Sequence, residues 1–403
     1  MLEPLRTDGD AGPGPRPLAD LRILDFSRVV AGPFATRMMS DLGADVLKVE
    51  PPDGDVTRFW GRSRAGLSGF YTQQNAGKRN ICVDLKAEGA RELLLDLARR
   101  ADMVVENYRP GVLDRLGLGY EALRSVNPAV IMLSISGFGQ DSSQAGRASY
   151  APIIHAESGL MERQAHFDEA PPSDPMLSIA DTNAALHGLV ALLSALHLRH
   201  RTGQGQHIDL AMVNAMAVTD DYAHFALDSE PARRLGGHVH ATGYGHILVA
   251  GDLRSQWFQL SRGGLVSDGL AADAPVETKA EVRQRIIAKF FGGWDSRDEL
   301  VAALDKANLA WADIRPAQEL FDSDLGVERR LTVEVDARDG ATRRVVESPY
   351  RFSDASAGIR GPAPWRGEHN AEALGDWLGL GADEVDRLSG AGVLHRDVPE
   401  DRA

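Results

Sequence analysis

The sequence of 403 residues contains a single cysteine, Cys82, which stands in the apolar run 80–83. One cysteine cannot form a disulfide within the chain, so the class of small disulfide-stapled folds is excluded. We expect this thiol to be a buried strand residue. The scarcity of cysteine favours a reducing, cytoplasmic setting.

Positive charge is also in short supply, because 44 lysines and arginines stand against 58 aspartates and glutamates, for a net charge of -14. Nucleic acids and anionic membranes both bind proteins through a basic surface. We therefore expect neither as a main partner, although a local basic pocket is compatible with this balance. Residues 1–17 lack the basic and then apolar order of a signal peptide, and no run of 18 apolar residues occurs. We predict a disordered leader at 1–17.

Strand and helix patterns alternate along the first 140 residues. They predict strands at 21–26, 44–50, 80–85, 102–106 and 130–135, with helices at 34–42, 88–100 and 120–126. Connections of this kind join parallel strands, so we predict a doubly wound, Rossmann-like parallel α/β sheet. The segments that follow the strands should line one ligand cleft. They contain neither GxGxxG nor a P-loop, which disfavours a dinucleotide-dependent dehydrogenase.

The rest of the chain divides by composition and pattern. We predict a large domain at 18–214, a smaller α+β domain at 215–330 and a C-terminal segment, 331–403, that returns to the large domain. In the smaller domain we expect a loop rich in glycine and histidine at 236–245. We also expect a hairpin of strands 247–250 and 257–261. The histidine pairs His197/His200 and His238/His240 lack a cysteine or carboxylate cluster, so we predict no metal site.

One carboxylate, Asp181, stands where a loop turns into a long apolar helix, in the stretch SIADTNAALHGL. Aspartate is a favourable N-cap, worth about 1 kcal/mol, and capping alone would account for it. The helix dipole and the free amides would stabilise the anion, so we expect Asp181 to be ionised at neutral pH. An ionised carboxylate with one free oxygen is a competent nucleophile. The residues alone leave both roles open.

Four other stretches carry a resemblance to a known family: ILDFSRVVAGP (23–33), LGADVLKVEP (42–51), VVENYRPG (104–111) and RTGQGQ (201–206). In this order the sequence resembles the class III CoA-transferases, such as formyl-CoA transferase and carnitine CoA-transferase, a family that also contains α-methylacyl-CoA racemases. The resemblance implies an interlocked-ring homodimer. It also implies a CoA-transferase acting between an acyl-CoA donor and a carboxylic acid acceptor, with coenzyme A as substrate and no tightly bound cofactor.

The resemblance also places functional residues. It implies that Asp181 is the catalytic aspartate, which attacks the donor thioester and becomes an aspartyl-CoA thioester. The implied CoA contacts follow the strand ends, and they are Val30, Ala31, Val83, Asp84, Leu85, Lys86, Asn107, Tyr108, Arg109 and Arg115, with Arg147 as a substitute for a lysine of the family. Basic residues grouped around one cleft of an acidic protein favour a phosphate-binding patch. Glycines of the 236–245 loop would provide a cover over the intermediate, or only turns.

Departures from the family limit the activity. The racemases carry a histidine where this chain has Tyr150, and a phenol with a pKa near 10 is a poor base at neutral pH. A 2-methylacyl-CoA racemase is therefore disfavoured, with His155 as the one nearby alternative base. An acidic residue of some transferases is Ala151 here, which argues against their small diacid substrates. His155 and Glu157 are either polar substrate contacts or a buried histidine and a loop carboxylate. A CoA-binding protein without activity is the alternative from another class.

Overall fold

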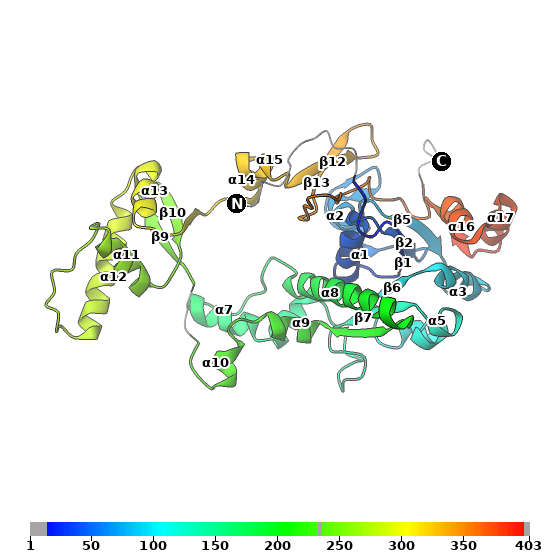
Figure 1. Ribbon diagram of the computed structural model, residues 1–403, viewed down its shortest axis with the longest axis horizontal. Coiled ribbons are helices and arrows are strands. Elements are labelled where there is room, and N and C mark those ends of the chain that lie inside the picture. The colour runs from blue at the N-terminus through cyan, green and yellow to red at the C-terminus, as the bar shows by residue number, and fades with distance from the viewer. Residues whose placement is uncertain (1–13, 233–235, 399–403) are drawn as a thin grey trace. The chain divides into compact units, whose positions relative to one another are not determined.

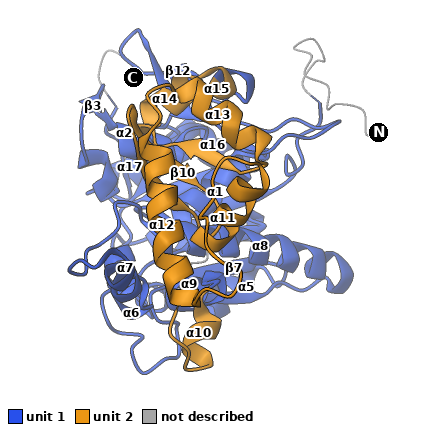
Figure 2. Ribbon diagram, turned by 90° about the vertical axis from the view of Figure 1, so that its left-hand side faces the viewer, with its two compact units in different colours: residues 1–221, 327–403 blue, residues 222–326 orange. Residues whose placement is uncertain are grey.

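The computed structural model describes residues 14–232 and 236–398, so most of the predicted leader lies outside the described residues. The chain forms two compact units (Figure 2). Unit 1 comprises Met1–Asp221 and Val327–Ala403, and unit 2 comprises Tyr222–Gly326. Each unit has an apolar core of its own.

Unit 1 is built on a seven-stranded sheet with the strand order β14-β5-β2-β1-β6-β7-β8 (Figure 1). The strands are β1 (Arg22–Asp25), β2 (Asp45–Glu50), β5 (Arg79–Val83), β6 (Met103–Glu106), β7 (Ile131–Ser136), β8 (His207–Ala211) and β14 (Leu394–His395). Neighbours pair in parallel, except that β14 runs antiparallel to β5. The α/β fold with a mostly parallel sheet, predicted from the sequence, is confirmed.

Helices cover both faces of this sheet, because successive strand residues point to opposite sides and both sides are apolar. In β1, Ile23 packs in one core and Leu24 in the other. The first core includes α1 (Ala31–Asp41), α8 (Ile179–Thr202) and α9 (Met212–Thr219). The second includes α3 (Ala90–Arg100), α5 (Tyr120–Val126), α16 (Asn370–Leu378) and α17 (Ala382–Gly390).

Helix α8 alone, among the described helices, has the length and apolar composition of a membrane span. Its buried residues, such as Leu189 and Leu192, belong to the core that covers one face of the sheet. Packing in that core therefore accounts for much of the apolar character of the helix.

Shorter elements complete unit 1. They are η1 (Val56–Phe59), β3 (Ser63–Arg64), β4 (Leu67–Ser68), α2 (Gly69–Asn75), α4 (Val112–Arg115), α6 (Ala151–Glu157), α7 (Leu160–Asp168), β12 (Thr332–Asp336) and β13 (Thr342–Val346). The C-terminal part of the chain packs on the N-terminal part. Arg343 on β13 donates to the Thr72 hydroxyl at 2.9 Å, and the Asn370 side chain accepts from the Cys82 backbone at 3.0 Å.

Unit 2 contains a three-stranded antiparallel sheet of order β11-β10-β9. Its strands are β9 (His238–Thr242), β10 (Gly245–Val249) and β11 (Trp311–Asp313). The helices of this part of the chain are α10 (Ala223–Leu227), α11 (Leu253–Arg262), α12 (Val276–Gly292), α13 (Arg297–Lys306), α14 (Ala317–Asp322) and α15 (Asp324–Glu328). The core gathers Ile247 and Val249 of the sheet against Leu260 and Phe291 of the helices.

Two interpretations of the sequence in this region are wrong. Residues 257–261, predicted as a strand, lie in α11. The Asp252 side chain accepts from the Ser255 N–H and caps a helix in which Leu253, Trp257 and Leu260 share one face. Residues 238–242, predicted as part of a loop, form β9 and pair with β10.

Candidate active site

The strand order of unit 1 reverses between β1 and β6, since the chain runs outward through β2 and β5 and then returns to the other side of β1. The connections leave such a point in opposite directions and open a crevice beyond the carboxyl ends of the strands. A cavity lies there, and all of its lining residues belong to unit 1. The lining is Arg28, Val29, Ala31, Asn107, Tyr108, Arg109, Pro110, Ile135, Ser136, Gly137, Ala145, Arg147, Ala148, Ser149, Tyr150, Asp181 and Met212.

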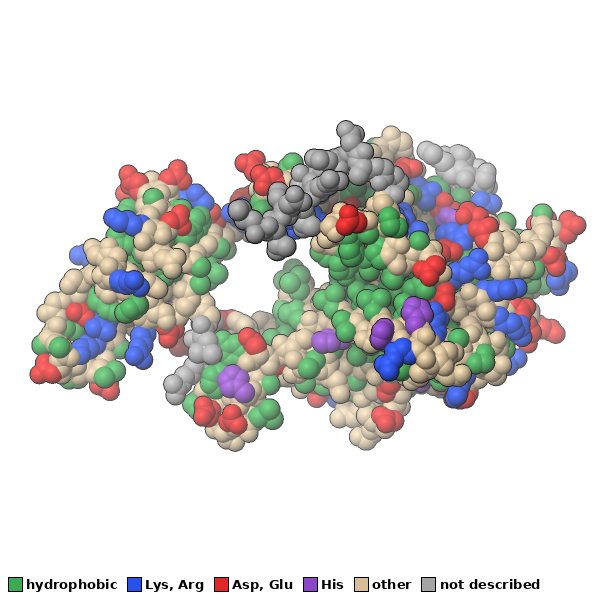
Figure 3. Space-filling model, viewed as in Figure 1, with side chains coloured by type: hydrophobic (Ala, Val, Ile, Leu, Met, Phe, Trp, Pro, Cys, Tyr) green, Lys and Arg blue, Asp and Glu red, His purple; other side chains and the backbone are tan. Residues whose placement is uncertain are grey.

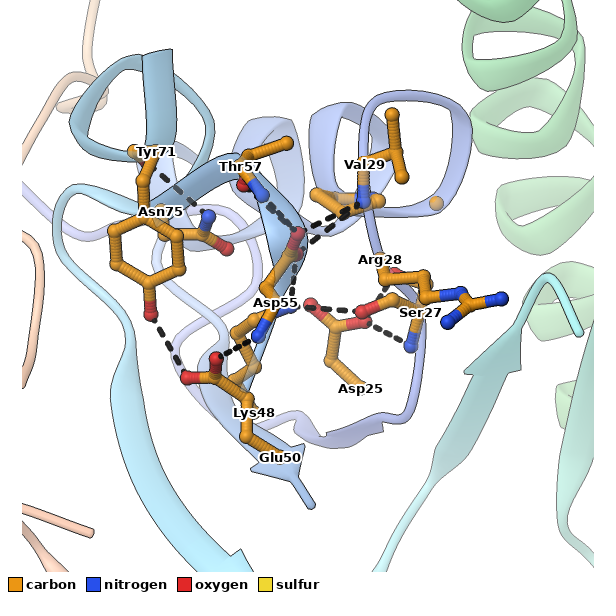
Figure 4. A network of polar contacts seen from close by, with 12 residues as sticks. Asp25, Ser27, Arg28, Val29, Lys48, Glu50, Asp55, Thr57, Tyr71 and Asn75 are labelled. Carbon is orange, nitrogen blue, oxygen red and sulfur yellow. Dashed lines mark hydrogen bonds and ion pairs between the residues drawn. The ribbon is translucent and has the colours of Figure 1, made fainter. Parts of the chain in front are cut away.

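Buried charges hold the loop after β1 in place (Figure 4). Asp25 accepts from the Ser27 backbone N–H at 3.0 Å, and Lys48 Nζ donates to the Ser27 carbonyl at 2.7 Å. Asp55 accepts from the N–H of Val29 at 3.2 Å. Val29 has φ of 70°, a backbone conformation that is costly for a β-branched residue and persists only when its surroundings enforce it. The buried groups therefore fix a strained loop at the rim of the cavity.

The charges of this network are balanced inside the protein. Lys48 lies 3.3 Å from Asp55, and Lys78 lies 2.9 Å from Asp25. Burial opposes the ionisation of Asp25, but Lys78 and Lys48 outweigh it and lower the pKa of Asp25 to about 2. Burial lowers the pKa of Lys78 to about 8. The attraction within the ion pairs offsets the hydration energy that these charged side chains lose on burial.

Asn107 joins the loops that follow β1 and β6. Its side-chain oxygen accepts from the Arg28 N–H at 2.8 Å, and its side-chain nitrogen donates to the Arg28 carbonyl at 2.8 Å. The Arg28 guanidinium lies 5.5 Å from the centre of the Tyr108 ring. Burial raises the pKa of Tyr108, so its phenol stays neutral at the edge of the cavity. The amide of Asn107 is thus engaged in fixing the wall of the cavity.

Asp181 lies at the N-terminal end of α8 and lines the cavity. The helix begins at Ile179, with Ser178 as the N-cap residue, so the interpretation of Asp181 as the N-cap is wrong. The helix starts two residues earlier than the sequence pattern indicated, so Asp181 is its third residue. Burial raises the pKa of Asp181 to about 7, so full ionisation at neutral pH is also wrong. The cause of this shift is the loss of hydration on burial.

The residues expected from the sequence fall into two groups. Those that line the cavity are Ala31, Asn107, Tyr108, Arg109, Arg147, Tyr150 and Asp181. Those that do not line it are Val30, Val83, Asp84, Leu85, Lys86, Arg115, His155 and Glu157. Residues 83–86 lie apart because they stand at the carboxyl end of β5, and β2 separates that strand from β1.

Two of the expected polar contacts have partners within the protein. Glu157 pairs with Arg147 at 2.6 Å, and the Arg147 guanidinium lies 5.0 Å from the centre of the Phe138 ring. His155 is buried, and both of its ring nitrogens are hydrogen bonded, to Asp174 and to the Ala180 backbone.

The sequence reasoning missed other lining residues, of which Arg28 is the most distinctive. It stands in the stretch ILDFSRVVAGP, directly after β1, so its place beyond a strand end was the available signal. Ser136 is the last residue of β7 and Gly137 follows it, so both also lie at a strand end. Ser149 carries no comparable pattern.

Three arginines, Arg28, Arg109 and Arg147, therefore surround the cavity, and among its described lining residues Asp181 is the one carboxylate. Guanidinium groups bind phosphates and carboxylates through paired hydrogen bonds. A carboxylate with a pKa near neutrality has a substantial ionised fraction and is less hydrated than one at the surface. Within residues 14–232 and 236–398, no cluster of three or more His, Cys, Asp or Glu side chains could hold a metal ion.

Comparisons with known proteins agree on one family. The model of CoA-transferase family III matches residues 18–370. Succinate–glutarate CoA-transferase of Agrobacterium fabrum is 34% identical over 387 residues, which cover 89% of this chain and 95% of the relative. Succinyl-CoA:mesaconate CoA-transferase of Haloarcula hispanica is 31% identical over 393 residues, covering 92% and 98%. The crystal structure of a CAIB/BAIF family protein from Brucella suis superposes with a TM-score of 0.76 at 29% identity, covering 90% of this chain and 100% of that one.

Proposed function

The chain belongs to CoA-transferase family III, and from this premise we propose that it transfers CoA through a covalent aspartyl-CoA intermediate on Asp181. The observation that carries the choice of nucleophile is the position of Asp181 in the cavity at the reversal of the strand order. The donor is an acyl-CoA thioester and the acceptor is a carboxylic acid.

The reaction proceeds by two exchanges that mirror each other. The Asp181 carboxylate attacks the donor thioester carbonyl, the C–S bond breaks, and a mixed anhydride and CoA thiolate form. The thiolate attacks the Asp181 carbonyl of the anhydride, which releases the donor acid as a carboxylate and leaves aspartyl-CoA. The acceptor carboxylate then attacks this thioester, and the thiolate returns to the acceptor carbonyl. Asp181 is regenerated, with no net uptake or release of protons.

The cavity supports this chemistry in two ways. Its arginines provide donors for the phosphates of CoA and for a substrate carboxylate. Asp181 is half-buried, and the loss of hydration that raises its pKa also leaves less water near the anhydride than at the surface. Ala151 argues against small diacids, but we propose a dicarboxylic acid as one of the two acids. The names of both relatives specify dicarboxylic acids, and three arginines line one cavity.

An interlocked-ring homodimer in the cytoplasm is part of the same proposal. Leu186, Val190 and Leu193 are exposed on α8, and their spacing places them on one face of the helix. Figure 3 shows hydrophobic side chains gathered over α1 and the adjacent part of α8. A second copy of the chain would cover such a surface. The cytoplasmic location rests on the single, buried cysteine.

Racemisation is less well supported. It needs a second base opposite Asp181, and Tyr150 is the residue that lines the cavity at the position of the racemase histidine. His155 has no free ring nitrogen for proton abstraction.

Peptide mass spectrometry after incubation with a panel of acyl-CoA thioesters tests the proposal. We expect a CoA adduct on the peptide that contains Asp181, converted by hydroxylamine to a hydroxamate, and no adduct in Asp181→Ala or Asp181→Asn. Transfer activity that persists in both variants would exclude Asp181 as the nucleophile. Deuterium incorporation at the α-carbon of a 2-methylacyl-CoA, without any adduct, would establish the racemase instead. CoA binding with neither signal would indicate an inactive binding protein.

A further inference from the structure

The imidazole of His155 on α6 is almost completely buried, with 1% of its surface exposed. Its Nδ1 lies 2.8 Å from Oδ1 of Asp174, and its Nε2 lies 3.1 Å from the backbone nitrogen of Ala180. A backbone N–H can only donate, so Nε2 is the acceptor and carries no proton. An ionised carboxylate can only accept, so Nδ1 carries the proton. The two contacts together select one neutral tautomer of the ring.

The Ala180 amide is one of the first N–H groups of α8, which have no acceptor inside their own helix. The N-cap residue of α8, Ser178, makes no side-chain capping bond. The ring of His155 therefore provides the acceptor that a capping side chain would otherwise supply. Ala180 immediately precedes Asp181, so this contact fixes the backbone next to the carboxylate in the cavity.

The hydrogen bond to Asp174 also holds the segment that precedes α8. Asp174 lies in the segment 169–178 between α7 and α8, and its hydrogen bond attaches that segment to α6. Helix α6 starts directly after Tyr150, which lines the cavity. One imidazole thus joins α6, the segment before α8 and the first turn of α8.

We propose that His155 is a positioning residue of the transfer reaction, held in the required tautomer by Asp174. This inference rests on the proposed role of Asp181 as the nucleophile. A nucleophile that is misplaced by about 1 Å reacts up to roughly 100-fold more slowly. Arg28 and Arg109 lie in the loops after β1 and β6, and only Arg147 contacts α6, through Glu157. A change at His155 should therefore lower the rate far more than it weakens the binding of acyl-CoA.

Four variants separate positioning from mere packing. His155→Leu removes the acceptor for the Ala180 amide at similar volume, whereas His155→Gln keeps an oxygen acceptor on a side chain of similar length. Asp174→Ala removes the partner of Nδ1, whereas Asp174→Asn keeps an acceptor for it. Each is compared with the wild type for steady-state kcat and KM and for the single-turnover rate of adduct formation on Asp181.

We expect His155→Leu to lower kcat and the rate of adduct formation by roughly 10- to 100-fold, with KM for acyl-CoA within about twofold of the wild type. His155→Gln should restore most of the rate, and Asp174→Ala should lose more than Asp174→Asn. Hydrogen exchange of the peptide 177–186 should accelerate in His155→Leu and Asp174→Ala, because the start of α8 is released.

An unchanged kcat in His155→Leu would overturn the inference, as would a change confined to KM or an equal loss in the Gln and Leu variants. If His155→Leu does not fold, Asp174→Ala decides, since Asp174 is partly exposed and its removal leaves the buried ring in place. Wild-type activity in that variant would then refute the inference. Absence of any adduct on the wild-type protein would instead contradict the proposed function itself.

Discussion

The ionisation of Asp181 governs the rate of the proposed reaction. Burial raises its pKa to about 7, so the nucleophilic carboxylate becomes protonated as the pH falls through that value. We expect the single-turnover rate of adduct formation to be constant above about pH 8, half of that near pH 7, and roughly tenfold lower at pH 6. Rapid-quench mass spectrometry across this range measures it. A rate that stays constant down to about pH 5 would show that the carboxyl group has an ordinary pKa.

Asp55 holds the strained loop through several contacts at once, since it accepts from the Val29 N–H and pairs with the fully buried Lys48. Asp55→Ala leaves Lys48 with less compensation inside the protein. We expect the free energy of unfolding in urea to fall by about 3–5 kcal/mol. Asp339→Ala breaks the more exposed pair with Arg64 and provides the control, with a loss below about 1 kcal/mol. Equal losses in the two variants would show that burial of the network contributes nothing.

The segment that carries Arg147 and Tyr150 is kept in place by a close approach to the end of β7. A methyl group added at Gly137 would overlap the Ser149 side chain, whereas one added at Gly146 would meet open space. We expect Gly137→Ala to displace the segment and lower kcat/KM for transfer by roughly tenfold or more, with Gly146→Ala unchanged. The double variant Gly137→Ala, Ser149→Gly should recover activity, because it removes the overlapping atoms. If activity does not recover, the effect of Gly137→Ala does not come from its overlap with Ser149.

The elements of unit 1 were largely predictable from the sequence, because buried parallel strands are continuous apolar runs and their helices have one apolar face. The strand predicted at 102–106 is β6, and the long apolar helix predicted at Asp181 is α8. The pattern failed at 257–261, where a short apolar run fits a strand or a helix and the Asp252 cap decides between them. For such a short run, contacts with the rest of the fold decide the secondary structure, and the hydrophobic pattern alone does not.

The candidate site was predictable only in part for the same reason. The strand ends predicted where the cleft lies, and the family resemblance implied Asn107 and Arg109 there; both line the cavity. The two hydrogen bonds between the Asn107 side chain and the Arg28 backbone could not be predicted, because they join loops that are far apart in the sequence. The pKa of Asp181 depends on how much of the carboxyl group is buried, which a single helix start does not reveal.

At the scale of the whole molecule, the proposed interlocked rings predict how the subunits behave in solution. Two rings that pass through one another cannot separate without unfolding. We therefore expect no heterodimers when two differently tagged preparations are mixed under native conditions, and statistical heterodimers after joint refolding from denaturant. Native mass spectrometry distinguishes these products. Exchange within minutes under native conditions would indicate a side-by-side dimer, and a monomeric mass would contradict dimerisation.

The pairing of β14 with β5 also determines the order in which the protein can be made. Leu394 pairs with Val83, and the chain returns to unit 1 at Val327, after unit 2. A ribosome delivers the chain from its N-terminus, and domains generally fold as units as they emerge. Unit 2 is continuous and can fold while synthesis proceeds, but the last strand of unit 1 is delivered only after the whole of unit 2 has been made. The larger unit, which holds the candidate active site, is therefore the last to be completed.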